Sequence, residues 1–362
     1  MILLLLWLMC GSATGSVIIY VDGDAGGAND GSSWCDAYNY LQDGLAAAVS
    51  GDEIRVAEGT YMADRSTSRP GGTGDRRETF QLVSGVMVRG GYAGCGQVDP
   101  DGRDREVYET VLSGDIGEAG VAADNSYHVV TGSGTDANTV LDGFTITGGN
   151  ADAAPSLYRF GGGMYNESGS PTVSNCIFIG NSASLYQGGG MINGGPANPV
   201  IINCTFSGNS AGNGGGAMYN YYGSSPSLTS CIFWQNGPNQ ILEEGPGDNP
   251  SIAYSDIQGG WEGEGNIDSD PQFADADGPD DIVGTDDDNF RLLSHSPCVN
   301  SGDNNAVAPW VLTDLDGKAR IVNETVDMGA YESEFMTVYY VDGVGGSDLN
   351  DGRTPKTAFA TI

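Results

Sequence analysis

Basic residues are scarce in this sequence. Only 14 Lys and Arg stand against 48 Asp and Glu in 362 residues, which gives a formal charge of −34. Proteins that bind nucleic acid or anionic membranes neutralise phosphate with Lys and Arg, so this composition argues against both partners. The chain has only two histidines, and no Cys/His spacing resembles that of a zinc site. Its acidity favours solubility, and divalent cations as ligands.

A membrane-spanning stretch is also lacking. The apolar run near the start, Leu3 to Met9, has seven residues, whereas a helix that crosses ~30 Å of hydrocarbon needs about 20. Small residues from Gly11 to Ser16 follow this run, which is typical of the end of a secretory signal. We therefore predict a signal peptide over residues 1–16, a secreted or cell-surface location, and no transmembrane segment in this chain.

One phrase recurs through the middle of the chain. SPTVSNCIFIGN from Ser170 returns as NPVIINCTFSGN from Asn198, SPSLTSCIFWQN from Ser225 and NPSIAYSDIQGG from Asn249, in steps of 28, 27 and 24 residues. Repeats of this length cannot each bury a hydrophobic face alone, so they must stack into a solenoid. A helical solenoid is disfavoured because 58 glycines leave few uninterrupted helical windows.

The register within the repeat predicts the kind of solenoid. Cys-x-Phe has a period of two, which indicates short strands with alternate residues pointing inward. The strings GGGMYN, GGGMIN and GGGAMYN between the phrases imply a second strand per coil, and Asn and Gly suit the corners. We therefore predict an all-β fold, a right-handed parallel β-helix with three short strands per coil.

Like residues of successive coils should stack in ladders along this β-helix. The expected ladders are Cys176, Cys204 and Cys231; Phe178, Phe206 and Phe233; Met164, Met191 and Met218; and Asn181, Asn209 and Asn236. Asparagine also follows the methionines, and there too we expect corners, at Asn166, Asn193 and Asn220.

The two ends of the chain differ from its middle. Apolar residues at helical spacing between Ala37 and Val49, with Asp36 as candidate N-cap, predict a helix that caps the first coil. Tyr340-Val341-Asp342-Gly343 repeats Tyr20-Val21-Asp22-Gly23, so a second unit should begin near the end. The expected organisation is an N-terminal strand and capping helix over 17–52, coils over 53–262, an acidic loop and closing segment of the β-helix over 263–335, and a truncated second unit over 336–362. Further β-helix units would follow in a longer protein.

The cysteines fall into two groups. Those of the ladder are expected to be small buried hydrophobes. Cys35 and Cys95 both lie in the N-terminal lobe, where the cap meets the early coils, and we predict a disulfide between them in a secreted setting. Cys298 has no obvious partner.

An acidic stretch, DSDPQFADADGPDDIVGTDDD over 268–288, carries carboxylates at alternating positions. Hard oxygen ligands at such spacing suit Ca²⁺, and a solvated acidic loop is the alternative. The candidate calcium ligands are Asp268, Asp270, Asp275 and Asp277. A weaker candidate set consists of Asp22, Asp24 and Asp30, where turn formation is the better explanation.

Eight of the fourteen bases lie between Arg55 and Arg105, and several of them share one polar loop. One interpretation is a binding loop for an acidic glycan. The other, which the sequence favours, is local ion pairing on an acidic surface. The residues concerned are Arg65, Arg69, Arg76 and Arg77, with Asp64, Asp75 and Glu78 as the expected partners.

Several strings carry a family resemblance. YVDGDAGGANDGSSWCDAYNYLQDGLAAA, GDEIRVAEGTY, FQLVSGVMVRGGYAG, VLDGFTITGGNA, SPCVNSGD and DLDGKARIVNETVDMGAYE resemble bacterial secreted β-helix proteins of the pectin-lyase-like superfamily. The last two strings are similar to the C-terminal part of proteins with a choice-of-anchor Q domain. The glycine strings with Phe-x-x-Asn resemble repeats of polymorphic outer-membrane adhesins. The resemblance implies an extracellular or surface protein, but this fold hosts lyases, hydrolases and adhesins alike.

The expected chemistry is limited by the shortage of bases. A uronate lyase needs a base, often Lys or Arg, yet between Val107 and Phe290 the only basic residue is Arg159 and the only histidine is His128. The Gly-His-Gly and Arg-x-Lys strings of polygalacturonase-like hydrolases are absent. We therefore expect a structural or adhesive surface module that binds a polysaccharide or cell-surface glycan, stabilised by calcium, with no catalytic residue assigned. The alternative is a polysaccharide lyase or glycoside hydrolase, since acids are plentiful.

Overall fold

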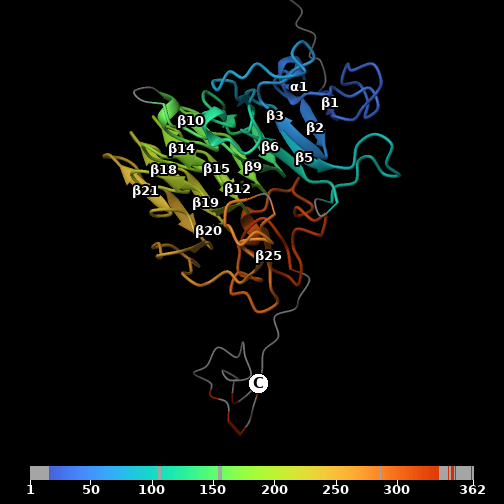
Figure 1. Ribbon diagram of the computed structural model, residues 1–362. Helices are drawn as coiled ribbons and strands as arrows, with labels where there is room; N and C mark the ends of the chain where they lie inside the picture. Colours follow the sequence, from blue (N-terminus) through green and yellow to red (C-terminus); the bar gives the residue numbers. More distant parts are fainter. Residues whose placement is uncertain are drawn as a thin grey trace, which may run out of the picture.

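The computed structural model describes residues 16–104, 107–153, 157–285 and 287–333, with five isolated positions beyond them (341, 344, 345, 347 and 360). The chain forms a right-handed parallel β-helix of three parallel sheets, which confirms the predicted fold (Figure 1). The predicted signal peptide, apart from Ser16, and nearly all of the predicted second unit lie outside the described residues. In the described part, no helix is long and apolar enough to span a bilayer.

The three sheets are named here I, II and III. Sheet I contains β1 (Ile18–Val21), β2 (Glu53–Ala57), β5 (Met87–Tyr92), β8 (Val140–Asp142), β11 (Thr172–Ser174), β15 (Val200–Ile202), β19 (Ser227–Thr229) and β22 (Ser251–Ala253). Sheet II contains β3 (Gly59–Met62), β6 (Thr110–Ser113), β9 (Thr145–Thr147), β12 (Ile177–Ile179), β16 (Thr205–Ser207), β20 (Ile232–Trp234) and β23 (Asp256–Ile257). Sheet III contains β4 (Phe80–Gln81), β7 (Val130–Thr131), β10 (Met164–Glu167), β14 (Met191–Gly194), β18 (Met218–Tyr221) and β21 (Ile241–Glu244).

Each coil runs from sheet III through sheet I to sheet II, as in β10, β11 and β12, and the next coil repeats the order. Sheets I and II are joined by a two-residue corner. Its first residue has left-handed backbone, with φ of 47° at Asn175 and 52° at Asn203. Asparagine tolerates this region better than most residues, which explains its recurrence there. Two short strands, β13 (Ser182–Ala183) and β17 (Ser210–Ala211), pair beyond sheet II.

The interior is built from ladders of like residues. Met164, Met191 and Met218 lie in register on neighbouring strands. The rings of Phe178 and Phe206 stack with centroids 4.5 Å apart, and those of Phe206 and Phe233 with centroids 4.7 Å apart. The three ladder cysteines are free and fully buried beside them. Burial of each such side chain stabilises the fold by ~1.5–3 kcal/mol, and every coil repeats the gain.

Two buried asparagine ladders run along the same stack. The Asn181 amide donates to Asn209 Oδ1 at 3.0 Å, and the Asn209 amide donates to Asn236 Oδ1 at 2.8 Å. The second ladder, Asn166, Asn193 and Asn220, lies within β10, β14 and β18 and not at corners as predicted. Its side chains are inward-facing and fully buried. The Asn166 amide donates to Asn193 Oδ1 at 3.1 Å, and the Asn193 amide donates to Asn220 Oδ1 at 2.9 Å. Stacking therefore satisfies the middle of the ladder, where lone polar groups would be costly to bury, while Asn166 Oδ1 and Asn220 Nδ2 at its two ends have no hydrogen-bond partner.

A short helix, α1 (Leu41–Ala47), covers the N-terminal end of the stack. It buries Leu41 and Leu45 against the first coils, next to β4 at the edge of sheet III. The helix begins after Tyr40, not after the predicted cap Asp36. The Asp36 carboxylate instead accepts hydrogen bonds from the Ala28 N–H and the Ser33 hydroxyl, both at 2.9 Å, within its own loop. At the other end of the stack, Trp261 packs against the main core.

The C-terminal segment, here residues 268–333, lies along the outside of sheet II and adds no further coil (Figure 1, orange to red). It contains an antiparallel pair, β24 (Phe273–Asp275) and β25 (Asn289–Leu292). Outward residues of sheet II, Ile177, Ile179 and Ile232, form a second hydrophobic cluster with it. The segment contacts several coils, since the Asn203 amide donates to the Asp327 carbonyl at 3.1 Å and Arg89 donates to the Trp310 carbonyl at 3.4 Å.

Three 3-10 turns complete the secondary structure of the described residues. They are η1 (Ala122–Asp124), η2 (Leu157–Arg159) and η3 (Asn304–Ala306). The second of these precedes β10 and positions the residues discussed next.

Candidate functional site

Two rows of side chains run along the outer face of sheet III. They occupy the strand positions that alternate with the inward methionine and asparagine ladders. Side chains alternate along a strand, so in β10 the residues next to Met164 and Asn166 point outward. The first outer row consists of Tyr165, Ile192, Tyr219 and Leu242. The second outer row consists of Glu167, Gly194, Tyr221 and Glu244.

Because Gly194 has no side chain, the ring of Tyr221 can lie across the strand that contains Gly194. A Cβ atom on Gly194 would lie 2.3 Å from Tyr221 Cε1 and 2.6 Å from the Tyr221 hydroxyl oxygen, so the ring occupies that space. The Tyr221 hydroxyl donates to Glu167 Oε2, two strands away, at 2.8 Å. The Tyr165 hydroxyl donates to the same oxygen at 3.2 Å. Two phenols from different coils therefore hold one carboxylate in place.

Loops beside the sheet form one wall of a groove over these rows. Phe160 follows η2, and its ring lies 5.7 Å from that of Tyr186. The Arg159 guanidinium lies 4.5 Å from the Phe160 ring centroid and 4.8 Å from that of Tyr186. The hollow has a volume of about 890 Å³ and is lined by Leu157, Arg159, Phe160, Tyr186, Gln187, Asn213, Tyr219, Tyr221, Tyr222, Glu244 and Gly245. Ligand sites commonly combine such aromatic walls with a few fixed polar groups. We call this hollow the tyrosine groove.

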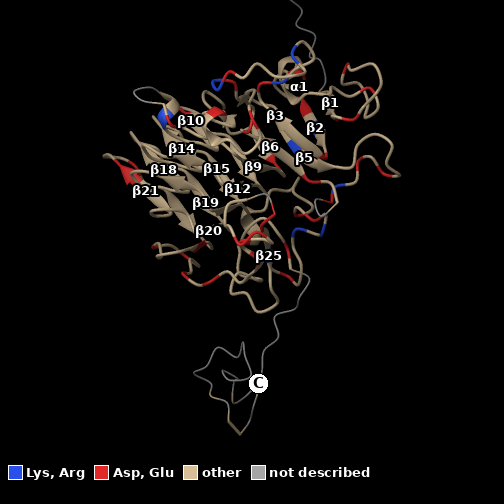
Figure 2. Ribbon diagram, viewed as in Figure 1, with Lys and Arg blue, Asp and Glu red and all other residues tan. Residues whose placement is uncertain are grey.

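A glutamate lies at each end of the second outer row, Glu167 at one end and Glu244 at the other. The Tyr219 hydroxyl donates to Glu244 Oε2 at 2.7 Å, as Tyr221 does to Glu167. Burial raises the pKa of Tyr219 and Tyr221 above the usual value for a phenol, and the hydrogen-bonded carboxylates raise it further. The phenols therefore remain protonated donors at any ordinary pH. Figure 2 shows acidic positions on β21 and a basic position beside β10.

The structure does not bring the predicted calcium ligands together. Asp268 accepts a hydrogen bond from the Gly259 N–H at 3.0 Å, and Asp270 accepts one from the Gln272 N–H at 2.9 Å. Asp275 lies in β24 and Asp277 in the turn that follows. Across the described residues, no group of three or more His, Cys, Asp or Glu side chains could hold a metal ion. The Asp268 and Asp270 carboxylates thus bond to nearby turn N–H groups, which is a common use of Asp in loops.

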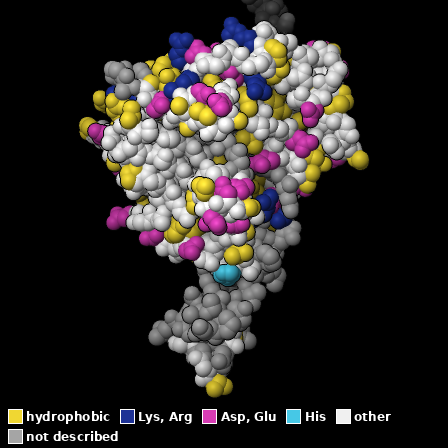
Figure 3. Space-filling model, viewed as in Figure 1, with side chains coloured by type: hydrophobic (Ala, Val, Ile, Leu, Met, Phe, Trp, Pro, Cys, Tyr) yellow, Lys and Arg dark blue, Asp and Glu magenta, His cyan; other side chains and the backbone are white. Residues whose placement is uncertain are grey.

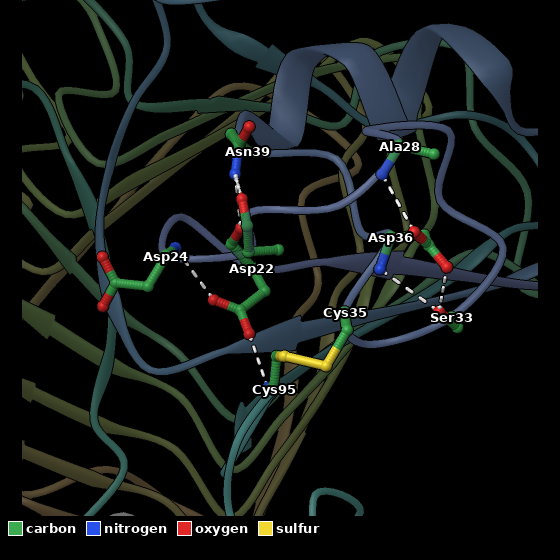
Figure 4. The surroundings of a disulfide bond; sticks show 9 residues. Asp22, Asp24, Ala28, Ser33, Cys35, Asp36, Asn39 and Cys95 are labelled. Carbon is green, nitrogen blue, oxygen red and sulfur yellow. Dashed lines mark hydrogen bonds between the residues drawn. A yellow bond between two sulfur atoms is a disulfide. The ribbon is translucent and has the colours of Figure 1, made fainter.

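The structure joins Cys35 and Cys95 in a disulfide, with Cα atoms 4.8 Å apart (Figure 4). Asp22 lies beside it and accepts hydrogen bonds from the Cys95 N–H at 2.7 Å and the Asp24 N–H at 2.9 Å. Asp30 similarly accepts from the Ser32 N–H at 3.0 Å. The weaker candidate set for calcium therefore organises turns around the disulfide. Cys298 is buried, and its thiol donates to Asp256 Oδ2 at 3.2 Å.

The sequence interpretation missed the tyrosine groove, although a signal for it exists. It used the inward positions of each coil, Met164, Met191 and Met218, as ladders. The residues one and three positions later must then point outward and stack in their turn. Reading those positions would have placed Tyr165 with Tyr219, and Glu167 with Tyr221. The contact of Tyr221 with Glu167 across Gly194 is a side-chain arrangement that this alternation alone does not specify.

No family model matches the chain, and no curated protein matches it. Among solved structures, the crystal structure of pectate lyase Pel9A is similar with a TM-score of 0.30 and 15% sequence identity, over 89% of this chain and 97% of that chain. The fold assignment rests on the sheets described above.

Proposed function

We propose that this protein is a secreted or cell-surface β-helix module that binds a glycan in the tyrosine groove. The observation that carries the proposal is the Tyr221 ring, laid over Gly194 and hydrogen-bonded to Glu167. Side chains held in this way form a rigid aromatic floor before any ligand arrives. Preorganisation of this kind lowers the entropic cost of binding.

Sugar rings match the chemistry of the groove. Their C–H faces pack on aromatic rings, and their hydroxyls donate to carboxylates such as Glu167 and Glu244. Arg159 is the only base among the lining residues, and its guanidinium lies between the Phe160 and Tyr186 rings. A uronate would therefore meet like charge from the two glutamates, which disfavours it. The groove suits a neutral or amino-substituted glycan better.

The disulfide supports the proposed location. Disulfides persist mainly in oxidising compartments outside the cytosol, and Cys35 is joined to Cys95 here. The apolar run at residues 3–9 supports the same proposal as part of a secretory signal.

A glycoside hydrolase is the alternative, because Glu244 lines the groove and a second carboxylate, Glu167, lies beside it, hydrogen-bonded to the lining residue Tyr221. They stand on strands three spacings of ~4.8 Å apart, which puts their Cα atoms roughly 14 Å from each other. Catalytic carboxyl pairs lie about 5–10 Å apart. Here each carboxylate is held by phenols, Glu167 by Tyr165 and Tyr221 and Glu244 by Tyr219, which keeps it from approaching the other and favours binding over hydrolysis.

Binding of the full chain to neutral glucans, xylans, mannans and chitin oligosaccharides tests the proposal. Tyr221→Ala should weaken binding at least about tenfold, while Tyr221→Phe, which keeps the ring, should retain most of it. Tyr254 is a matched control, because its hydroxyl also donates to a glutamate, Glu264, at 2.8 Å but outside the groove. Equal effects of Tyr221→Ala and Tyr254→Ala would refute the proposed site. New reducing ends that vanish in Glu167→Gln would establish the hydrolase instead.

A further inference from the structure

A second hollow lies at the opposite end of the outer face of sheet III. It is bounded by α1, β4 and the loop over 63–79, and β4 is two strands before β10 in the sheet. Its volume is about 470 Å³, and its lining residues include Arg65, Arg69 and Arg77. We call it the arginine pocket. Figure 2 shows basic positions along the chain near α1, and Figure 3 shows basic side chains at the same upper end of the molecule.

The loop that forms the pocket is held by specific hydrogen bonds. Asp64 Oδ2 accepts from the N–H groups of Thr73 at 2.8 Å and Gly74 at 3.0 Å. Thr67 donates its N–H at 2.8 Å and its hydroxyl at 2.7 Å to Asp43 of α1. The Gln42 side chain donates to the Thr79 carbonyl at 3.1 Å. The arginines therefore project from an ordered wall anchored to the capping helix.

The predicted local ion pairing occurs for only part of the basic loop. Arg77 pairs with Asp75 at 2.6 Å, and Arg76 pairs with Asp152 at 2.8 Å, in another coil. Arg65 and Arg69 form no ion pair with any described carboxylate.

Arg65 also keeps Nε buried without a hydrogen-bond partner. The expected partner Asp64 bonds to the loop backbone instead, and Glu78 lines the pocket without pairing to either arginine. Two guanidinium groups without carboxylate partners in one pocket are unusual on a chain with a formal charge of −34.

We propose that the arginine pocket binds the carboxylate or sulfate group of an acidic saccharide. Guanidinium groups recognise planar or tetrahedral oxyanions through two parallel hydrogen bonds. Hydroxyl and amide side chains in the same lining, including Ser66, Ser68 and Gln81, supply partners for sugar hydroxyls. Two carboxylates also line the pocket, but Asp64 is held by the Thr73 and Gly74 N–H groups, and the three arginines outnumber the two acids. Charges beyond the ~8 Å Debye length at physiological salt are largely screened.

Binding of the full chain to polygalacturonate, to dextran sulfate and to uncharged dextran tests this proposal. Arg69 is exposed, so Arg69→Gln should fold normally and weaken binding of a bound polyanion about tenfold. Arg65→Gln should do the same and the double variant should lose more. Asp75→Asn should tighten binding, because it releases Arg77 from its ion pair. Whichever polyanion binds identifies carboxylate or sulfate as the group recognised.

Two controls separate this site from other effects. Lys318→Gln makes the same charge change on the C-terminal segment and should alter polyanion affinity less than twofold. Tyr221→Ala should leave polyanion binding intact, so failure of the tyrosine groove and failure of the arginine pocket are distinguishable. The proposal is overturned if the chain binds both polyanions no better than dextran, or if Arg69→Gln and Lys318→Gln weaken binding equally.

Discussion

The guanidinium of Arg320 pairs with the carboxylate of Glu332 within the C-terminal segment, where the two side chains are 1% and 0% exposed. Arg320 Nη1 also donates to Asn175 Oδ1, at the corner between sheets I and II, at 3.2 Å. The pair thus joins the C-terminal segment to the side of the β-helix.

Removal of one member of this pair should destabilise the C-terminal segment strongly. Arg320→Ala leaves a buried carboxylate without its partner, and we expect a loss of about 3–5 kcal/mol in unfolding free energy, measured by urea denaturation. Lys318→Gln removes a more exposed partner, at 29% exposure, and should cost less than about 1 kcal/mol. Equal losses in the two variants would contradict the structural role of Arg320.

The stability of the C-terminal segment should decrease as the pH rises, which is the opposite of the usual effect of carboxylates. Burial raises the pKa of Asp314 and Asp327 in the segment to about 6, against hydrogen bonds that lower it. It does the same for Asp256 in β23, which accepts a hydrogen bond from the Cys298 thiol of the segment. A carboxyl with a raised folded pKa contributes stability that is fully present below its unfolded pKa of 3.8 and is lost as pH rises to about 6. Hydrogen exchange of residues 289–333 should therefore show weaker protection at pH 7 than at pH 4.5, after correction for intrinsic rates. Asp256→Asn should reduce this difference, and protection that increases with pH would contradict it.

In the ladder of Asn181, Asn209 and Asn236, the middle residue, Asn209, should be the most sensitive to substitution. Asn209 Oδ1 accepts from the Asn181 amide, and its own amide donates to Asn236 and to the Phe178 carbonyl at 2.8 Å. Asn209→Ala would leave buried partners unsatisfied on both sides, and we expect a loss of about 3 kcal/mol or more in unfolding free energy. Asn198→Ala, at an exposed position that also bonds to neighbouring coils, is the control and should cost less. A similar loss at both positions would argue against the ladder.

Gly194→Ala should weaken glycan binding without destabilising the fold. The added Cβ would displace the Tyr221 ring, but the atoms it meets belong to the end of a side chain and can move. We expect glycan affinity to fall as in Tyr221→Ala while the midpoint of urea denaturation changes little. If Gly194→Ala binds glycan like the unaltered chain, the position of the Tyr221 ring does not matter for binding.

The coils could be predicted because their information is local and repeated. Period-two spacing around Phe178 and its equivalents specifies strands, and the 27- and 28-residue steps specify which strands are neighbours. The position of the second asparagine ladder was predicted wrongly, because asparagine suits corners in general and only the stacked amides favour Asn193 inside a strand.

The C-terminal segment and the candidate site depend on contacts between distant parts of the sequence. The short strand at Ile177–Ile179 is buried on both faces, but nothing in its sequence tells which segment covers it. Arg320 meets Asn175 across 145 residues, and Tyr221 meets Glu167 across 54. The first pair carries no periodic signal. The 54 residues of the second pair equal two 27-residue steps, so periodicity places both residues in one outward row, but it does not specify that Tyr221 reaches across Gly194 to Glu167. The lack of ion pairs at Arg65 and Arg69 could not be predicted from the sequence either. Acidic residues that are close in sequence are not necessarily close in space.

The path of the C-terminal segment has a mechanical consequence. A stretched solenoid would ordinarily unwind from its last coil, since that coil has a neighbour on one side only. Here the chain leaves the last coil and is fastened again to the middle and early coils, through Asn203, Asn175 and Arg89. A pull on the chain beyond residue 333 is therefore carried first by these side attachments. The coils between these attachments and the end of the stack bear no tension until the attachments break. The C-terminal segment therefore protects the last coils from being unwound by force.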